Sequence, residues 1–187
     1  MLRALGGHAF SFGSLDDAEE TTMDFPRRAA EIFAQAAGPH LPPNRPFTFV
    51  FVSIRSAEWD DSKPLLYLKN TRRLKGRAEV ELLRTEEASP ENLEIKIARP
   101  GFLVTGIKSG LKGPLKAIGR RLPGGMVDVE RLSHCLLRIA LGDFPDHAIF
   151  EAEFLNEHGK QDYGQRPNAF IRLGRNIRDR IMRHHHQ

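Results

Sequence analysis

The residues best suited to chemistry in this chain are five cationic side chains in the segment 108–125, which contains no acidic residue. We call this segment the basic run, and its cations are Lys108, Lys112, Lys116, Arg120 and Arg121. Lysine and arginine neutralise phosphate charge, and the planar guanidinium of arginine also makes paired hydrogen bonds to phosphate oxygens. The first four cations recur every four residues, which on a helix would place them in one stripe. The basic run therefore predicts a polyanionic partner.

Two further cationic clusters lie outside the basic run. One surrounds Arg72 and Arg73 and contains no acid, and the other surrounds Arg175 and Arg178 and holds six arginines against one acid. Six phosphate contacts would make affinity fall with roughly the fifth power of the salt concentration. We expect the three clusters to bind phosphate together if the fold brings them to one surface.

Nucleotide-binding and metal-binding motifs are absent from the sequence. Neither G-x-x-x-x-G-K-[ST] nor G-x-G-x-x-G occurs, although the glycines of the basic run would let a backbone approach phosphate closely. The internal histidines are dispersed and show no paired spacing of the kind that holds a metal ion. We therefore expect neither a cofactor nor a metal site.

A metal-dependent nuclease is the enzyme that the sequence offers as an alternative. Glu94 and Lys96 form an E-x-K element, and Glu79 or Glu81 stands upstream on what the pattern predicts to be the preceding strand. Two carboxylates would hold Mg²⁺ while the lysine stabilises developing charge. The same alternation also fits two ordinary surface residues that pair with charges on the neighbouring strand, so this element does not by itself predict catalysis.

The first functional hypothesis is a non-catalytic nucleic-acid-binding protein, with RNA ahead of DNA, that forms part of a larger complex. Its cations would contact the phosphate backbone, which positions a nucleic acid without specifying its sequence. The second hypothesis is an assembly subunit whose basic patches meet acidic protein partners. The nuclease is a third, and association of residues 107–122 with an anionic membrane is a fourth.

Composition limits the cellular setting more than the activity. The chain has 187 residues and a net charge of +4, and its only cysteine, Cys135, rules out an internal disulfide. Cys135 lies in an apolar run, which predicts a buried and inert thiol. No apolar stretch approaches the roughly 20 residues that cross a bilayer, so we expect no transmembrane segment and a cytoplasmic location.

Periodicity predicts one α+β domain with a largely antiparallel sheet and three to four helices packed on it. We expect an N-terminal extension over residues 1–23, a core domain over 24–174 and a basic C-terminal helix and tail over 175–187. The elements expected within the core are a helix over 24–37, a central strand over 47–54, a hairpin of 78–83 with 93–98, a strand over 102–107, a helix over 127–141 and a strand over 147–155.

Overall fold

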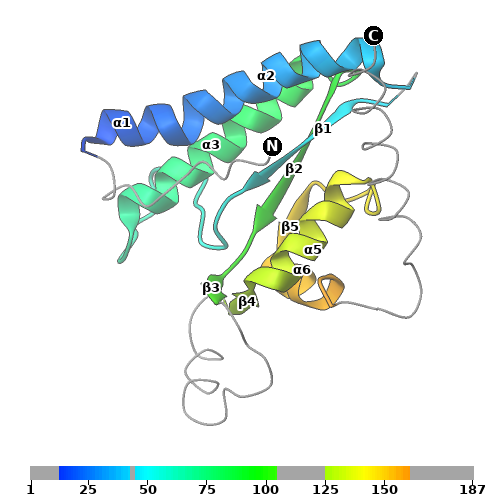
Figure 1. Cartoon of the computed structure of the whole chain (residues 1–187). Helices are drawn as coiled ribbons and strands as arrows, with labels where there is room; N and C mark the ends of the chain where they lie inside the picture. Colours follow the sequence, from blue (N-terminus) through cyan, green and yellow to red (C-terminus); the bar gives the residue numbers. More distant parts are fainter. Residues whose placement is uncertain (1–12, 43–44, 105–124, 161–187) are drawn as a thin grey trace.

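The computed structural model describes residues 13–42, 45–104 and 125–160. In these ranges a parallel sheet lies between two layers of helices, as Figure 1 shows. The first layer contains α1 (Leu15–Glu19), α2 (Phe25–Ala37) and α3 (Lys69–Ala88), and the second contains α5 (Val129–Ala140) and α6 (Ala152–His158). Each face of the sheet therefore has its own apolar core.

The first helical layer begins earlier than the sequence predicts. The chain is helical from Leu15, where the hydroxyl of Ser14 accepts a hydrogen bond from the backbone N–H of Asp17. The expected helix over 24–37 is confirmed as α2, with Pro26 in its first turn. The part of this layer that precedes β1 consists of α1 (Leu15–Glu19), the π-helical turn η2 (Glu20–Asp24), α2 (Phe25–Ala37) and the short 3₁₀ helix η3 (Gly38–His40).

All strand pairs in the described residues are parallel. The main sheet has the order β1-β2-β5, and a separate pair is formed by β3 and β4. The remaining elements are β1 (Phe47–Val52), α3 (Lys69–Ala88), β2 (Leu93–Arg99), β3 (Phe102–Val104), β4 (Met126–Asp128), α5 (Val129–Ala140), β5 (Ile149–Glu151) and α6 (Ala152–His158).

The predicted antiparallel sheet is therefore wrong, and the predicted hairpin is the reason. Residues 78–83 belong to the long helix α3, which carries the chain from the end of β1 back to the start of β2. A crossover of this kind makes the two strands parallel, whereas a hairpin would have made them antiparallel. The strand over 47–54 was also expected at the centre of the sheet, but β1 lies at its edge and β2 lies in the middle.

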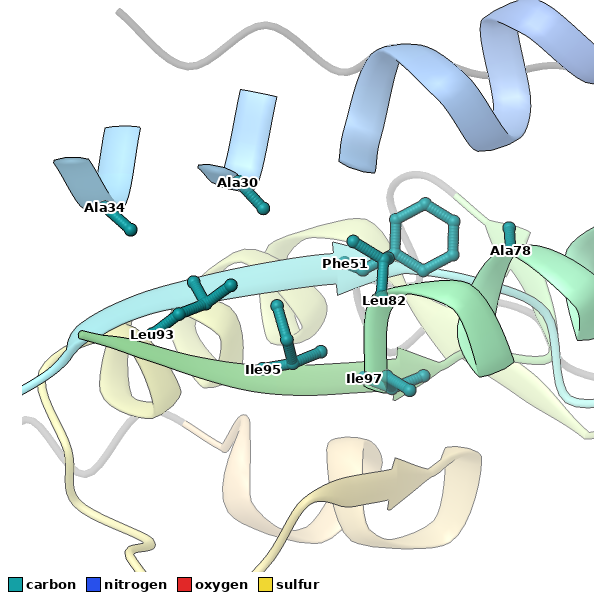
Figure 2. Close-up of a cluster of buried hydrophobic side chains, with 8 residues drawn as sticks. All are labelled: Ala30, Ala34, Phe51, Ala78, Leu82, Leu93, Ile95 and Ile97. Atoms are coloured by element: carbon teal, nitrogen blue, oxygen red, sulfur yellow. The ribbon is translucent and has the colours of Figure 1, made fainter. Parts of the chain in front are cut away.

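The core between the sheet and the first helical layer is formed by small residues on α2 and large residues on the strands. Ala30 and Ala34 face the sheet, where their short side chains let α2 pack closely over Leu93 and Ile95 of β2 (Figure 2). From α3 the side chain of Leu82 completes the layer. The other buried members of this cluster are Phe51, Ala78 and Ile97.

The second core lies under α5, whose prediction over 127–141 is confirmed. Leu132, Cys135 and Ile139 recur at helical spacing and pack on Ala98 and Phe150 of the sheet. Cys135 is fully buried, and burial raises the pKa of its thiol to about 11, which agrees with the expected inert cysteine.

The predicted strand over 147–155 forms only in part. The strand β5 ends at Glu151, and the chain continues directly into α6, which packs with α5 through the buried Leu155. The alternating apolar pattern that suggested a strand is therefore divided between a short strand and a short helix.

The loop between β1 and α3, residues 53–68, is pressed against the helix that follows it. The backbone N–H of Glu58 donates to the carbonyl of Arg72, and the same segment crosses α3 at Gly76. A β carbon on Gly76 would lie 1.9 Å from the carbonyl oxygen of Glu58. Only glycine leaves enough room for this crossing.

Replacement of Gly76 by alanine should therefore destabilise the protein although alanine is the better helix former. The new methyl group meets backbone rather than a movable side chain, so we expect a loss of about 3 kcal/mol in the free energy of unfolding. Chemical denaturation measures this loss. Gly38→Ala is the matched control, because nothing lies within 4 Å of a β carbon there and its effect should stay within about 0.5 kcal/mol. Equal stabilities of the two variants would contradict the close crossing.

Candidate functional site

The carboxyl edge of the main sheet is where the described polar residues gather. Parallel sheets bind ligands beyond the carboxyl ends of their strands. At this edge Ser53 follows β1, β2 ends in Arg99 and β5 ends in Glu151, and α3 adds Lys75 and Glu79. Three of these five residues, Ser53, Lys75 and Glu79, are buried.

A fully buried carboxylate organises this edge. Glu79 is 0% exposed and accepts hydrogen bonds from Nε and Nη2 of Arg99, at 3.0 and 2.5 Å. Its Oε2 also accepts from the indole Nε1 of Trp59 at 2.5 Å. Arg99 uses Nη1 to reach Glu151 at 3.1 Å. This set of bonds ties α3, β2, β5 and the β1–α3 loop to one another.

Arg99 stays cationic at this position despite being partly buried. Burial by itself lowers the pKa of an arginine, but the hydrogen bonds and negative charges of Glu79 and Glu151 raise the pKa of Arg99 overall. Because Arg99 donates to two carboxylates in three hydrogen bonds, its role here is to hold the edge together.

Lys75 is a second cation beside this network, and unlike Arg99 it is buried. Its ammonium group donates one long hydrogen bond to the carbonyl of Val52, at 3.5 Å, and lies 4.9 Å from the ring centroid of Phe51. Burial lowers the pKa of Lys75, and the nearby charge of Glu79 offsets part of that effect. The hydroxyl of Ser53 is also buried and has no hydrogen-bond partner among the described residues.

The cationic cluster predicted around Arg72 and Arg73 is used largely inside the protein. Arg72 donates through Nε to the carbonyl of Ser56 at 2.7 Å, and Arg73 donates through Nη2 to the carbonyl of Lys63 at 3.1 Å. Further along α3, Arg77 pairs with Asp61 at 2.9 Å. These three arginines fasten the β1–α3 loop to the helix, a role that the composition of the cluster did not predict.

The fastened loop presents a group of large apolar side chains to solvent. Trp59 is 47% exposed, Tyr67 is 44% exposed and Leu66 is fully exposed. Leu68, which follows them, adopts a left-handed backbone conformation with φ of 47°, which is rare for a residue with a branched side chain. The sequence analysis missed these residues, because only the structure distinguishes an exposed aromatic ring from a buried one.

Each of the two exposed aromatic rings is covered on one face by an arginine. The guanidinium carbon of Arg72 lies 4.9 Å from the ring centroid of Tyr67, and that of Arg99 lies 5.3 Å from the ring of Trp59. These are cation–π contacts, and they hold the rings in place without burying them.

The basic run is joined to the same edge of the sheet. Its cations lie outside the described residues, but Val104, which precedes the run, and Gly125, its last residue, are described. Val104 ends β3, which follows β2 directly, and the carbonyl of Gly125 accepts a hydrogen bond from Phe102. Figure 1 places β3 and β4 just beyond the carboxyl end of β2. The other predicted phosphate ligands, Arg175 and Arg178, also lie outside the described residues.

The E-x-K element lies on β2, away from the carboxyl edge. Lys96 is buried and uses its ammonium group for three contacts, to the carbonyls of Pro145 and His147 and to the carboxylate of Glu94 at 2.8 Å. An ammonium group has three donors, so none remains for a phosphate. Glu81 lies on α3, where it pairs with Arg84. Within the described part of the chain, no group of three or more His, Cys, Asp or Glu residues is arranged to hold a metal ion.

Comparisons with known proteins supply no family for this chain. No family model matches it, and no curated protein shows significant sequence similarity to it. Among the helices of the described ranges, none has both the length and the apolar character needed to cross a membrane. The functional argument therefore depends on the residues themselves.

Replacement of Glu79 by glutamine should strongly destabilise the protein, because Arg99 would lose its buried partner charge. Breaking one side of a buried ion pair costs about 3 kcal/mol or more. Urea denaturation followed by the fluorescence of Trp59, the only tryptophan in the chain, measures the change. Glu81→Gln on the same helix is the control, because exposed pairs contribute at most about 1 kcal/mol. A Glu79→Gln protein as stable as the control would contradict the organising role of this carboxylate.

The free energy of unfolding should increase as the pH rises into the alkaline range, because Lys75 is buried. Its pKa is lower in the folded state than the ordinary value of 10.5, so between those two values the unfolded chain binds more protons and stability increases with pH. Lys75→Met removes this contribution, and Lys69→Met at an exposed position retains it. Unfolding free energies measured between neutral pH and about pH 10 test the difference. Parallel pH profiles for the native protein and Lys75→Met would refute the assignment.

Proposed function

We propose that this protein binds nucleic acid, RNA ahead of DNA, as a non-catalytic subunit of a larger cytoplasmic complex. Its cations contact the phosphate backbone, and the carboxyl edge of the sheet is the surface on which the nucleic acid lies. Lys108, Lys112, Lys116, Arg120 and Arg121 supply the main phosphate contacts. Arg175 and Arg178 remain part of the proposal on the evidence of sequence alone.

The observation that supports the proposal is the attachment of two cationic clusters to one edge of the sheet. On α3 this edge is reached by Lys75 and Glu79, and the chain leaves the edge at Val104, before the basic run, and rejoins it at Gly125. A β carbon on Gly125 would lie 3.7 Å from Nη1 of Arg55, which belongs to the β1–α3 loop. A cationic surface on the ligand-binding edge of a parallel sheet favours an anionic ligand.

The internal contacts of α3 change how much each predicted cation contributes to phosphate binding. Arg72 and Arg73 each spend at least one donor on the β1–α3 loop, so they contribute less phosphate binding than an exposed pair. The basic run consequently carries more of the binding free energy. An exposed aromatic residue beside these cations suits unpaired bases, which places RNA ahead of duplex DNA.

Removal of two cations from the basic run should reduce both affinity and its dependence on salt. For a single strand the logarithm of the binding constant falls by about 0.7 per phosphate contact for each tenfold rise in salt. We therefore expect Arg120→Gln with Arg121→Gln to reduce the slope by about 1.4. Fluorescence anisotropy with a labelled oligoribonucleotide at several salt concentrations provides the measurement.

Arg45→Gln with Arg84→Gln is the charge-matched control for this experiment. Arg45 comes just before β1 and Arg84 lies on the C-terminal half of α3, both toward the amino ends of the strands, so the slope should remain unchanged. If the native protein fails to bind RNA or DNA at low salt, the proposal is wrong. Equal slopes for both double variants would instead remove the basic run from the binding surface.

A further inference from the structure

We infer that the β1–α3 loop is a base-stacking site for single-stranded nucleic acid, with Tyr67 as its principal platform and Trp59 as a second. The inference rests on the proposed function and names the form of nucleic acid that the edge recognises. Stacking on aromatic side chains requires unpaired bases, because the bases of a duplex are already stacked on one another.

The first argument is the way in which the two rings are held. Arg72 covers one face of Tyr67, and Arg72 itself is fixed by the carbonyl of Ser56 at 2.7 Å. Arg99 lies over one face of Trp59, whose indole N–H is fixed by Glu79. Each ring is therefore anchored from the protein side while 44% and 47% of the two residues remain exposed. A ring positioned in advance loses little conformational entropy when a base stacks on it.

The second argument is the spacing of the two anchors. Arg72 and Glu79 are seven residues apart on α3, which places them on the same side of the helix. At 1.5 Å per residue this separation is about 10 Å, the length of roughly three stacked nucleotides. The spacing of the two anchors therefore matches the length of one short segment of a single strand.

The third argument is the charge around the platform. Lys69 is exposed in the first turn of α3, and Arg72 retains guanidinium donors beyond the one used on Ser56. Near Trp59 the acids of the loop are largely matched, since Glu58 pairs with Lys63 at 2.7 Å and Asp61 pairs with Arg77. Asp60 instead receives hydrogen bonds from Ser62, which lower its pKa and keep it negative. Tyr67 therefore lies in the more cationic part of the loop and ranks first.

The decisive variant is Tyr67→Ala, compared with Leu66→Ala on the neighbouring residue. Leu66 is the more exposed of the two, but it has no aromatic face, so it separates base stacking from general apolar docking. Stacking is worth about 1–3 kcal/mol per base, so Tyr67→Ala should weaken binding of a labelled oligouridylate roughly 5- to 150-fold. Leu66→Ala should leave this affinity unchanged, and Tyr67→Phe should keep most of the native affinity.

Trp59 supplies an internal readout of the same event. Because it is the only tryptophan in the chain, its fluorescence reports stacking at this loop without an added label. We expect oligouridylate to quench this fluorescence and a duplex of the same length to bind without quenching it. The unchanged emission of free Tyr67→Ala would show that the loop remains folded in that variant.

The outcomes separate this inference from the proposed function. Tight binding that is unaffected by Tyr67→Ala and equal for single strand and duplex would overturn the stacking site and leave the phosphate contacts standing. Binding to neither form would overturn the proposed function and the stacking site together. Equal losses with Leu66→Ala and Tyr67→Ala would reassign the loop to apolar docking, as would sedimentation with phosphatidylserine vesicles that depends on Leu66.

Discussion

The rest of the structure depends on the hydrogen bonds and the ion pair of the buried carboxylate of Glu79. A charge removed from water is tolerated only when hydrogen bonds and an opposite charge replace the lost solvation. Arg99 and Trp59 supply that replacement, and they come from β2 and from the β1–α3 loop. The requirement to satisfy one carboxylate therefore fixes the register of α3 on the sheet and the path of the loop above it.

The same constraint explains why the sequence predicted the wrong sheet. The buried side of α3 includes Thr71, Lys75 and Glu79, so the apolar stripe that normally reveals a helix is interrupted by polar residues. What remained was a short alternation over 78–83, and six residues of alternation fit a strand as well as a helix. Hydrophobic periodicity cannot reveal a helix that buries charged residues whose partners lie on other elements of the fold.

Elements that bury only apolar residues were predictable from the same sequence. The helix α5 places Leu132, Cys135 and Ile139 on one side and begins at an Asp128 cap, and both features are visible without a structure. The candidate site was predictable in part. Its cations were evident from the sequence. Which of them bind other parts of the protein and which face solvent depends on the positions of their hydrogen-bond donors. The exposure of Trp59 and Tyr67 depends on the path of the loop.

The proposed function consequently assigns two physically different tasks to the cations of this protein. In the cluster around α3, Arg72, Arg73 and Arg77 hold the β1–α3 loop, so in that proposal they act mainly through the shape of the loop. The hydrogen bonds of Arg72 and Arg73 to backbone carbonyls depend less on salt than phosphate neutralisation does. Cations that are grouped together in the sequence therefore need not bind the same ligand. In the function proposed above, the steep dependence on ionic strength belongs to the basic run, and the selection of unpaired bases belongs to the loop that the arginines of α3 hold in place.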